Sequence, residues 1–548
     1  MGARGLPMTP KETITSGKAI LGIEFGSTRI KAVLIDEENK PIAQGSHEWE
    51  NQLHDGIWTY STEAIWYGLA DCYADLRKNV KREYDCEIEI LASIGISAMM
   101  HGYMPFGPNG VASAGAPVGE SEKLLSPFRT WRNTNTGAAA AELSELFNYN
   151  IPLRWSISHL YQCILDNEEH VPGITYLTTL AGYIHWRLTG EKVLGIGDAS
   201  GMIPVDPETK NYNAEMVQKF DDLVAKYNFP WKLEDILPKC ICAGEQAGFL
   251  TEHGAHRLDI SGHLKPGCPL CPPEGDAGTG MVATNAVKQR TGNVSAGTSS
   301  FSMIVLEKDL SKPSEMIDMV TTPDGSLVAM VHCNNCTSDI NAWVKLFKEY
   351  QELLGIPVDM NEVYAKLYNH ALTGNTDCGG IMAYNFISGE PVAGLQEGRP
   401  MFLRSANDKF NLANFMRANL YGTVAVLKLG NDILFNEEKV KVDRITGHGG
   451  LFKTPGVGQK VLAAAINSPI SVMETAGEGG AWGIALLAAY LINNKGMNLA
   501  DYLETIVFAG NTGVEIQPDP ADVEGFNKYI ETYKACIPVA QKATECKK

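Results

Sequence analysis

Apolar residues gather in two runs that flank a short polar turn near the start of the chain. Both runs lie within residues 19–36, and Gly26-Ser27-Thr28 separates them. This pattern predicts a buried β-hairpin with a functional loop at its tip. Gly26 lets a ligand approach the backbone because it has no Cβ, Ser27 and Thr28 add hydroxyl groups, and Lys31 adds a positive charge. Such a loop can bind phosphate, although a Gly-Ser-Thr turn alone is more often only a turn.

The same pattern returns in the second half of the chain. Within residues 293–307, the turn Gly297-Thr298-Ser299 stands 271 residues after the first turn (297 − 26) and is again followed by an apolar run. A repeat of this length predicts two similar domains rather than a solenoid, whose repeats are far shorter. Two phosphate loops, one in each domain, indicate a nucleotide bound in a cleft between the domains.

The residues after the first hairpin predict an α/β domain with a mixed sheet. A third strand is expected at residues 42–43, and residues 63–80 have apolar side chains at helical spacing. Residues 88–97 predict a buried strand that ends at Met99-Met100-His101-Gly102. Ligand-binding groups commonly lie where a central strand of an α/β sheet ends. A buried His101 with its hydrogen bonds satisfied inside the core is the alternative interpretation.

Residues 128–135 combine aromatic and amide side chains, among them Trp131 and Asn133. An aromatic face suits the apolar side of a sugar, and amides suit its hydroxyl groups. A loop with a half-buried tryptophan explains this segment equally well. Further along, residues 138–146 and 177–188 are predicted helices, the second with a C-cap at Gly190, and residues 198–201 are predicted to form a polar loop.

Asp276 lies between glycines, in Gly275-Asp276-Ala277-Gly278. A carboxylate there is open to whatever approaches the backbone, as a general base must be. An aspartate between glycines is more often a turn residue. Its position favours the base, because it follows the first domain and opens the segment that leads to the second hairpin, where the floor of a cleft is expected.

The second half contains a strand, a glycine turn and a helix between residues 442 and 466, after a helix predicted at 415–429. Such a turn can hold the adenosine part of a nucleotide against the backbone and a helix N-terminus. Gly449, Gly450 and Lys453 are the candidate residues. The apolar stretch 481–492 has the length of a buried helix, and residues 526–543 predict a surface helix.

Composition and charge narrow the class of protein. A chain of 548 residues favours two large domains, and 44% hydrophobic with 20% charged residues is typical of a soluble globular protein. The net charge of −18 and the lack of a basic block argue against nucleic acid or an anionic membrane as partner. No apolar run reaches the roughly 18 residues of a membrane span, and residues 1–18 do not resemble a signal peptide. A cytoplasmic protein is therefore expected.

Two C-x-x-C pairs stand among the twelve cysteines, at Cys268–Cys271 and Cys333–Cys336. In a zinc ribbon the two pairs would be only about 12–20 residues apart. Free, buried thiols in a reducing compartment are the favoured interpretation, with zinc as the alternative.

Taken together in this order, these segments resemble the FGGY family of carbohydrate kinases, which are built on the actin-like ATPase fold of two ribonuclease-H-like domains. The resemblance runs from about residue 20 to the C-terminal tail. It rests on two phosphate loops (residues 22–28 with Lys31, and 295–299), Met100-His101-Gly102 as a sugar contact, Gly275–Gly278 as the catalytic aspartate segment, and Gly449-Gly450 with residues 478–485 as the adenosine-binding signature.

The chain departs from the family pattern at three places. Glu24 stands where the family usually has aspartate; that carboxylate lies near the Mg²⁺–phosphate region, so the metal geometry is in question. Met99 replaces the usual glutamine, and Trp131-Arg132-Asn133-Thr134-Asn135 loses both charges of the usual Trp-x-Asp-x-Arg motif. The nucleotide side is thus closer to the family pattern than the sugar side.

The resemblance implies ATP-dependent phosphorylation of a ketopentose, of the xylulose or ribulose type, with Asp276 as base and Mg²⁺ near Glu24. Alternatives are a kinase for rhamnulose, fuculose, erythritol or glycerol, an actin-like ATPase, and a non-catalytic sugar sensor. The expected domains are residues 18–286 for the sugar and catalytic groups and 287–530 for the nucleotide. The expected partners are a small sugar and ATP, and a homodimer is left open.

Overall fold

The computed structural model describes residues 8–108, 124–473, 479–511 and 513–546. The chain forms two compact units. Unit 1 comprises Met1–Val287, Met319–Leu327 and Glu478–Ala509, and unit 2 comprises Lys288–Asp318, Val328–Gly477 and Gly510–Lys548. Unit 1 therefore contains a segment from late in the sequence. The predicted division at residue 286 stays a prediction.

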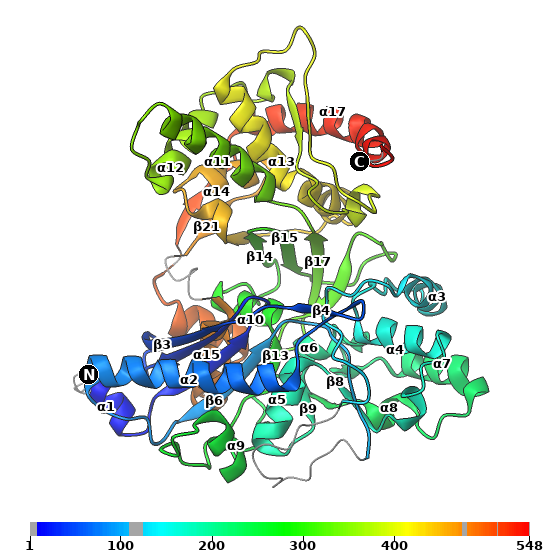
Figure 1. Cartoon of the computed structure of the whole chain (residues 1–548), viewed down its shortest axis with the longest axis vertical. Coiled ribbons are helices and arrows are strands. Elements are labelled where there is room, and N and C mark those ends of the chain that lie inside the picture. Colours follow the sequence, from blue (N-terminus) through cyan, green and yellow to red (C-terminus); the bar gives the residue numbers. More distant parts are fainter. Residues whose placement is uncertain (1–7, 109–123, 474–478, 512, 547–548) are drawn as a thin grey trace. The chain divides into compact units, whose positions relative to one another are not determined.

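Unit 1 is built on a five-stranded sheet with the order β13-β6-β1-β2-β3 (Figure 1). Strands β1, β2 and β3 are antiparallel neighbours, whereas β6 runs parallel to β1 and β13 runs parallel to β6. The bounds are β1 (Ile20–Phe25), β2 (Arg29–Ile35), β3 (Pro41–Glu48), β6 (Ser93–Ala98) and β13 (Glu274–Gly275). The first predicted hairpin and its third strand are confirmed, and the strand predicted from residue 88 begins at Ser93.

Helices cover both faces of this sheet. Side chains along a strand point alternately to the two faces of the sheet. The contacts of single residues in β1 and β3 therefore show which helix covers which face. A Cβ on Gly45 of β3 would touch α2 (Thr62–Tyr84), whereas a Cβ on Gly22 of β1 would touch α15 (Gly479–Asn493). Gly22 pairs with Val33, and Gly45 pairs with its neighbour Ala32, so the two glycines point to opposite faces. The apolar stretch predicted as a buried helix is α15.

The other elements of unit 1 surround this sheet. They are α1 (Pro10–Thr15), β4 (Gln52–His54), β5 (Ile57–Thr59), β7 (Met104–Phe106), α3 (Gly137–Phe147), α4 (Ser156–Leu165), β8 (Tyr176–Thr178), α5 (Leu180–Thr189), β9 (Val193–Gly195), α6 (Ile196–Ala199), β10 (Val205–Asp206), β11 (Asn211–Tyr212), α7 (Ala214–Val224), α8 (Leu233–Ile236), β12 (Lys239–Ile241), α9 (Glu252–Leu258), α10 (Asp276–Ala283) and α16 (Leu499–Tyr502).

Unit 2 repeats the sheet of unit 1. Its order is β16-β17-β15-β14-β20-β21-β22, with β14 and β15 as an antiparallel hairpin, β17 antiparallel to β15, and β20 and β21 parallel to β14. Strands β17, β15, β14, β20 and β21 thus match β3, β2, β1, β6 and β13 in order and direction. The duplication predicted from the two glycine turns is confirmed at the level of the whole sheet.

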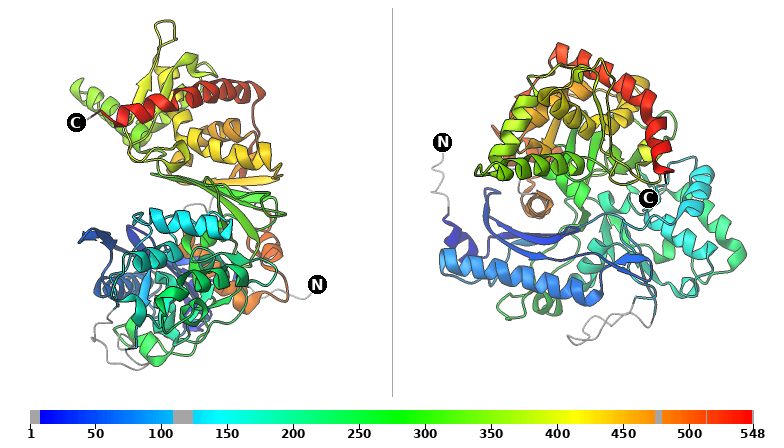
Figure 2. Two further views of the ribbon diagram at one scale, coloured as in Figure 1. Left: turned by 90° about the vertical axis from the view of Figure 1, so that its right-hand side faces the viewer. Right: turned by 45° about the horizontal axis from the view of Figure 1, so that its top comes forward.

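The elements of unit 2 complete the fold. Helix α17 lies at the surface of the unit, in red, and packs on α14 (Figure 2). The bounds are β14 (Thr291–Ala296), β15 (Ser300–Val305), β17 (Leu327–Cys333), α11 (Ser338–Leu353), α12 (Met360–Ala371), β18 (Met382–Tyr384), β19 (Met401–Leu403), α13 (Leu412–Asp432), β20 (Arg444–His448), α14 (Val457–Ile466), β21 (Ile470–Val472), β22 (Val514–Ile516) and α17 (Pro520–Thr544). The edge strand β16 (Asp318–Thr321) pairs within this sheet, although its residues from Met319 on are assigned to unit 1.

Two predicted elements of unit 1 are corrected. The helix predicted from residue 177 is a short strand, β8, followed by α5, because the Thr179 side chain accepts the Gly182 N–H and caps the helix there. Gly190 ends α5 with φ 85°, as predicted. The segment predicted as a polar loop at 198–201 is instead fully buried, and its first half belongs to α6.

All four cysteines of the two C-x-x-C pairs are buried, in line with the favoured interpretation. Among the helices of the described residues, none is both long and apolar enough to span a bilayer.

Candidate active site

The tip of the first hairpin is held by aromatic side chains. Trp49 Nε1 donates to the Gly26 carbonyl at 2.8 Å, and the Tyr60 hydroxyl donates to the Ser27 carbonyl at 2.6 Å. Trp131 Nε1 donates to Ser27 Oγ at 3.1 Å. The predicted phosphate loop and the predicted sugar loop of unit 1 are therefore in direct contact. Thr28 stays exposed at the tip of the turn.

Glu24 occupies a crowded position on β1. A Cβ on Gly480 would lie 2.2 Å from Glu24 Oε1, so the glycine leaves room for the carboxylate at the start of α15. Burial and the nearby Asp276 charge raise the Glu24 pKa to about 7, whereas the Lys31 charge and a hydrogen bond from the Ala481 N–H oppose this rise. A carboxylate beside a helix N-terminus is stabilised by the helix dipole. Glu24 thus links the first hairpin to α15.

The end of β6 has an unusual backbone. His101 has φ 65° and Gly102 has φ 107°, so the chain turns sharply after the strand. The His101 ring is only 4% exposed, its Nδ1 lies 2.9 Å from the Gly201 carbonyl, and it stacks on Trp155 with ring centroids 6.2 Å apart. Since a carbonyl accepts, Nδ1 carries the hydrogen of this bond.

Asp276 is the first residue of α10 rather than a turn residue, which was the alternative interpretation. Its Oδ1 accepts the Met100 N–H at 3.2 Å, which joins the predicted base to the predicted sugar segment. Burial raises the Asp276 pKa to about 6, and hydrogen bonds from backbone N–H groups, first among them Met100, counteract this rise. The carboxylate is therefore a stronger proton acceptor than an ordinary aspartate and is still ionised at neutral pH.

Two further carboxyl groups that the sequence analysis did not identify lie beside the base. Asp198 is fully buried, and its Oδ2 accepts the Thr179 hydroxyl at 2.6 Å. Glu274 is 1% exposed and accepts backbone N–H groups of α6. Burial raises both pKa values to about 8, and the charge of Asp276 contributes at Asp198. The only sequence signal was the place of Glu274 two residues before Asp276.

The segment around Trp131 is fixed by the backbone of the β4–β5 hairpin. Asn133 Oδ1 accepts the Trp58 N–H at 2.9 Å, and its Nδ2 donates to the carbonyls of Trp58 and Thr130 at 2.8 and 2.9 Å. The guanidinium of Arg132 stacks 3.9 Å from the centre of the Trp58 ring. The Asn133 amide thus holds the loop that carries Trp131.

The predicted nucleotide residues of unit 2 lie together at one edge of its sheet. Strands β14 and β20 are parallel, so Gly297-Thr298-Ser299 and Gly449-Gly450 both follow the carboxyl ends of neighbouring strands. Gly449 has φ 98°, and a Cβ there would lie 2.7 Å from the Ala296 carbonyl oxygen. Lys453 is exposed at the end of the turn after Gly450. Of the predicted adenosine signature, Glu478 lies outside the described residues.

One group of potential metal ligands occurs among the described residues, in Cys163, Glu168 and His170. It includes neither C-x-x-C pair. Both oxygens of Glu168 accept hydrogen bonds from Arg129 Nη2, at 2.7 and 2.6 Å, and burial raises the Cys163 pKa to about 12. A guanidinium beside a protonated thiol disfavours a cation, so this cluster is an ion-pair network.

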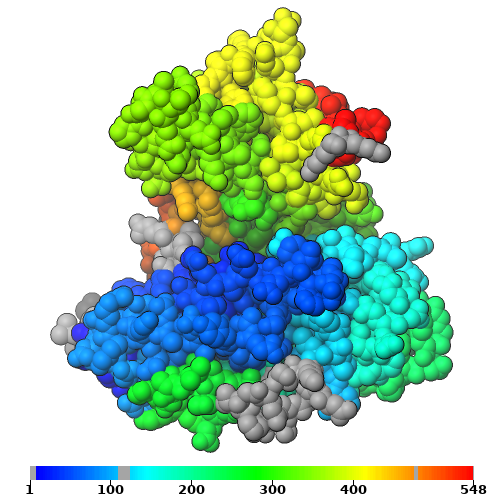
Figure 3. All heavy atoms as spheres, viewed as in Figure 1, coloured from blue at the N-terminus to red at the C-terminus, as the bar shows by residue number. Residues whose placement is uncertain are grey.

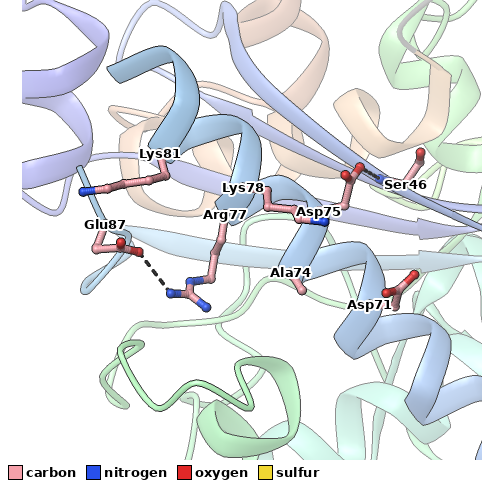
Figure 4. A pocket seen from close by; sticks show the side chains of 8 residues that line it. All are labelled: Ser46, Asp71, Ala74, Asp75, Arg77, Lys78, Lys81 and Glu87. Carbon is pink, nitrogen blue, oxygen red and sulfur yellow. Dashed lines mark hydrogen bonds and ion pairs between the residues drawn. The ribbon is translucent and has the colours of Figure 1, made fainter. Parts of the chain in front are cut away.

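A surface cavity of about 630 Å³ lies over α2. This helix is part of the blue surface of unit 1 in Figure 3. Ser46 N–H donates to Asp75 Oδ2 at 3.0 Å, and Arg77 pairs with Glu87 at 3.0 Å (Figure 4). Asn79 also donates to the Gln44 carbonyl. Asp75 and Asn79 thus bind backbone groups of the edge strand β3, and Arg77 is held by its ion pair with Glu87. None of the predicted site residues lines this cavity.

Comparison with known proteins agrees with this arrangement. Residues 19–264 match the N-terminal domain and residues 292–492 the C-terminal domain of the FGGY family of carbohydrate kinases. The chain is 21% identical to the xylulose kinase of Lactococcus lactis subsp. lactis (strain IL1403) over 533 residues, which cover 94% of this chain and 95% of the relative. A shorter match, 24% identical over 298 residues, covers 52% of this chain and 56% of the L-fuculokinase of Salmonella typhi.

Solved structures share the whole fold. The ligand-bound xylulose kinase from Lactobacillus acidophilus superposes with a TM-score of 0.77 at 18% identity, over 96% of this chain and 99% of that one. The gluconate kinase from the same organism has a TM-score of 0.76 at 17% identity, with the same coverage. From the two domain matches and the matching fold, this chain belongs to the FGGY family of carbohydrate kinases.

Proposed function

We propose that this carbohydrate kinase transfers the γ-phosphate of ATP to the terminal hydroxyl of a ketopentose, of the xylulose or ribulose type. The observation that carries the proposal is the hydrogen bond from the Met100 N–H to Asp276. Met100 is the residue directly before His101. The hydrogen bond ties a proton acceptor to a residue suited to bind sugar hydroxyls. The relative with near-complete coverage, a xylulose kinase, supports the choice of a ketopentose.

Asp276 accepts the proton of the attacking hydroxyl in this mechanism. Its pKa of about 6 lies close to the operating pH, where a general base is most effective. His101 would contact sugar hydroxyls, and the bond from its Nδ1–H to the Gly201 carbonyl fixes the orientation of the ring. Met100 and Gly102 shape the wall beside it, and Trp131 offers an apolar face, with Asn133 holding its loop.

The two glycine turns stabilise phosphate charge. Phosphoryl transfer depends mostly on positioning and on electrostatic stabilisation of the phosphate oxygens. Backbone N–H and hydroxyl groups of Gly26-Ser27-Thr28, with Lys31, and of Gly297-Thr298-Ser299 would provide both. The turn at Gly449-Gly450, with Lys453 at its end, would bind the rest of the nucleotide.

Mg²⁺ would be held through water by Glu24. Oxygen ligands and retained waters are typical of this ion in nucleotide sites. The Glu24 carboxylate fits, because its pKa of about 7 leaves it partly ionised at neutral pH and a nearby cation would favour the ionised form. When bound with ATP, the ion would neutralise charge on the transferred phosphate.

A panel of acceptors tests the proposal. ADP release would be measured with purified protein, ATP and Mg²⁺ for each of D-xylulose, L-xylulose, D-ribulose, L-ribulose, L-rhamnulose, L-fuculose, gluconate, glycerol and erythritol. Strong turnover with one ketopentose is expected. Turnover only with another acceptor would reassign the substrate within the same family, for which the match to an L-fuculokinase gives a reason. Slow ADP release that no acceptor accelerates would contradict the kinase proposal and favour an ATPase.

A further inference from the structure

Helix α6 begins at a residue that cannot cap it. The N-cap position is Gly195, with φ −64° and ψ 144° and no side-chain hydrogen bond to the first turn. The first N–H groups of a helix need acceptors, which a Ser, Thr, Asp or Asn at the N-cap usually provides. Here Gly197 N–H donates to Glu274 Oε1 at 3.3 Å, and Asp198 N–H donates to Glu274 Oε2 at 2.9 Å. The cap of α6 is therefore a carboxyl group from another element, β13.

The Glu274 carboxylate occupies the space of the missing N-cap side chain. A Cβ on Gly195 would lie 2.2 Å from Glu274 Oε1, and a Cβ on Gly197 would lie 2.4 Å from Oε2. In addition, the Gly195 N–H donates to the Pro273 carbonyl at 2.8 Å, so β13 and the start of α6 meet at two adjacent residues. Burying a carboxyl group this completely is costly unless it is well hydrogen-bonded.

From Glu274, hydrogen bonds continue to the sugar-binding histidine. Asp198 donates to Glu274, the Asp198 carbonyl accepts the Gly201 N–H at 3.0 Å, and the Gly201 carbonyl accepts His101 Nδ1–H at 2.9 Å. The turn of α6 thus carries the contact from β13 to the end of β6.

The contacts then close into a ring. Met100, next to His101, donates its N–H to Asp276 Oδ1, and Asp276 follows Glu274 by two residues. Gly275 between them allows this close approach, because a Cβ there would lie 2.2 Å from Met100 Cγ. The base and the histidine are therefore connected by two routes, one through Met100, the residue before the histidine, and one through α6.

We propose that Glu274 is a positioning residue for the base. From β13 it caps α6 and so closes the hydrogen-bonded ring. This ring orients Asp276 and His101 toward one sugar. The inference rests on the proposed function for the roles of those two residues. The role requires a carboxyl group beside the first turn of α6, whichever element supplies it. It can therefore be tested by moving this group to another residue.

Three variants test the proposal. Glu274→Gly removes the cap and opens the ring. The double variant Gly195→Asp/Glu274→Gly returns a carboxylate to the same space from the ordinary N-cap position. The φ and ψ of residue 195 suit an N-cap, whereas its new Cβ would lie 2.7 Å from the Pro273 carbonyl oxygen and requires a small shift of that backbone. Asp259→Asn is the control, because Asp259 is another buried carboxylate of unit 1 that accepts backbone N–H groups, including that of Leu264 at 2.9 Å, but lies outside the ring.

The kinetic result should separate positioning from general loss of structure. For Glu274→Gly, kcat with the best sugar of the panel should fall by about 10- to 100-fold, since small displacements of a reacting group cost this much. KM for ATP should change less than about 3-fold, because the change lies away from the predicted nucleotide residues. The double variant should recover most of kcat. Asp259→Asn should lower the melting temperature while leaving kcat per folded molecule unchanged.

Hydrogen exchange gives a readout that needs no activity. In Glu274→Gly, the amide of Met100 should exchange faster together with those of Gly197, Asp198 and Gly201, and the double variant should restore their protection. The proposal is overturned if Glu274→Gly keeps both kcat and Met100 protection, or if the double variant regains its melting temperature but not kcat. An inactive wild type would refute the proposed function instead, and the exchange data would still decide whether the ring exists.

Discussion

Replacing Asp276 by asparagine tests the centre of the proposed mechanism. Asparagine has nearly the same shape and keeps an oxygen that can accept the Met100 N–H, now at 3.2 Å from Asp276 Oδ1. The change therefore removes the proton acceptor and leaves the local hydrogen bond. Since general base catalysis typically contributes a factor of about 10² to 10⁴, kcat should fall by that amount while KM for ATP stays near the wild-type value.

The free energy of unfolding of this variant should rise, although its kcat falls. The folded-state pKa of about 6 lies above the ordinary value of 3.8, so the unfolded chain loses this proton first as the pH rises. The ionised group therefore costs stability progressively between about pH 4 and pH 6, and the cost is complete above pH 6. At about 1.4 kcal/mol for each pKa unit, asparagine should raise the free energy of unfolding at pH 7 by at most about 3 kcal/mol.

Two measurements check the prediction together. Steady-state ADP release with the best sugar of the panel gives kcat and KM, and urea unfolding at pH 5 and pH 7 gives the stability. An inactive variant of equal or greater stability supports the role of a base. A variant that turns over at the wild-type rate would refute it, and a variant that is inactive because it is less stable than the wild type would refute the physical argument about burial.

Three other predictions follow from the same contacts. First, kcat/KM of the wild type should rise with pH through an apparent pKa near 6, because Asp276 must be ionised to accept a proton, and a pH profile without this limb would contradict the role. Second, Glu24→Gln should raise the Mg²⁺ concentration for half-maximal activity by about 10-fold or more, as measured by Mg²⁺ titration; an unchanged requirement would exclude Glu24 from the metal site. Third, Gly22→Ala should destabilise the fold by about 1–3 kcal/mol, because the added methyl would lie 2.1 Å from the Ala481 carbonyl oxygen. Thermal melting checks this against Gly137→Ala, where the methyl meets no atom within 4 Å.

Local patterns were enough to predict the two hairpins, the similarity between them and several of the helices. Apolar runs beside Gly26 and Gly297 indicate strands and turns through neighbouring residues alone, and the repeat predicts two similar folds. The residues after β6 and at the start of α10 were also identified, because ligand groups gather at strand ends. Their chemistry, a histidine and an aspartate, is visible in the sequence, whereas the hydrogen bond between their segments is not.

Only the tertiary structure decided which distant segments complete the site. Helix α15 lies against β1 although more than 450 residues separate them, and glycines at 22 and 480 make sense only once that contact is known. The segment 198–201 looked like a polar loop, since its polarity is a local property, while the satisfaction of its polar groups depends on Thr179 and Glu274. Burial also set the pKa of Asp276. The sequence by itself determined the elements and the candidate chemistry; close packing and desolvation, which join residues far apart in the chain, decided how that chemistry is arranged.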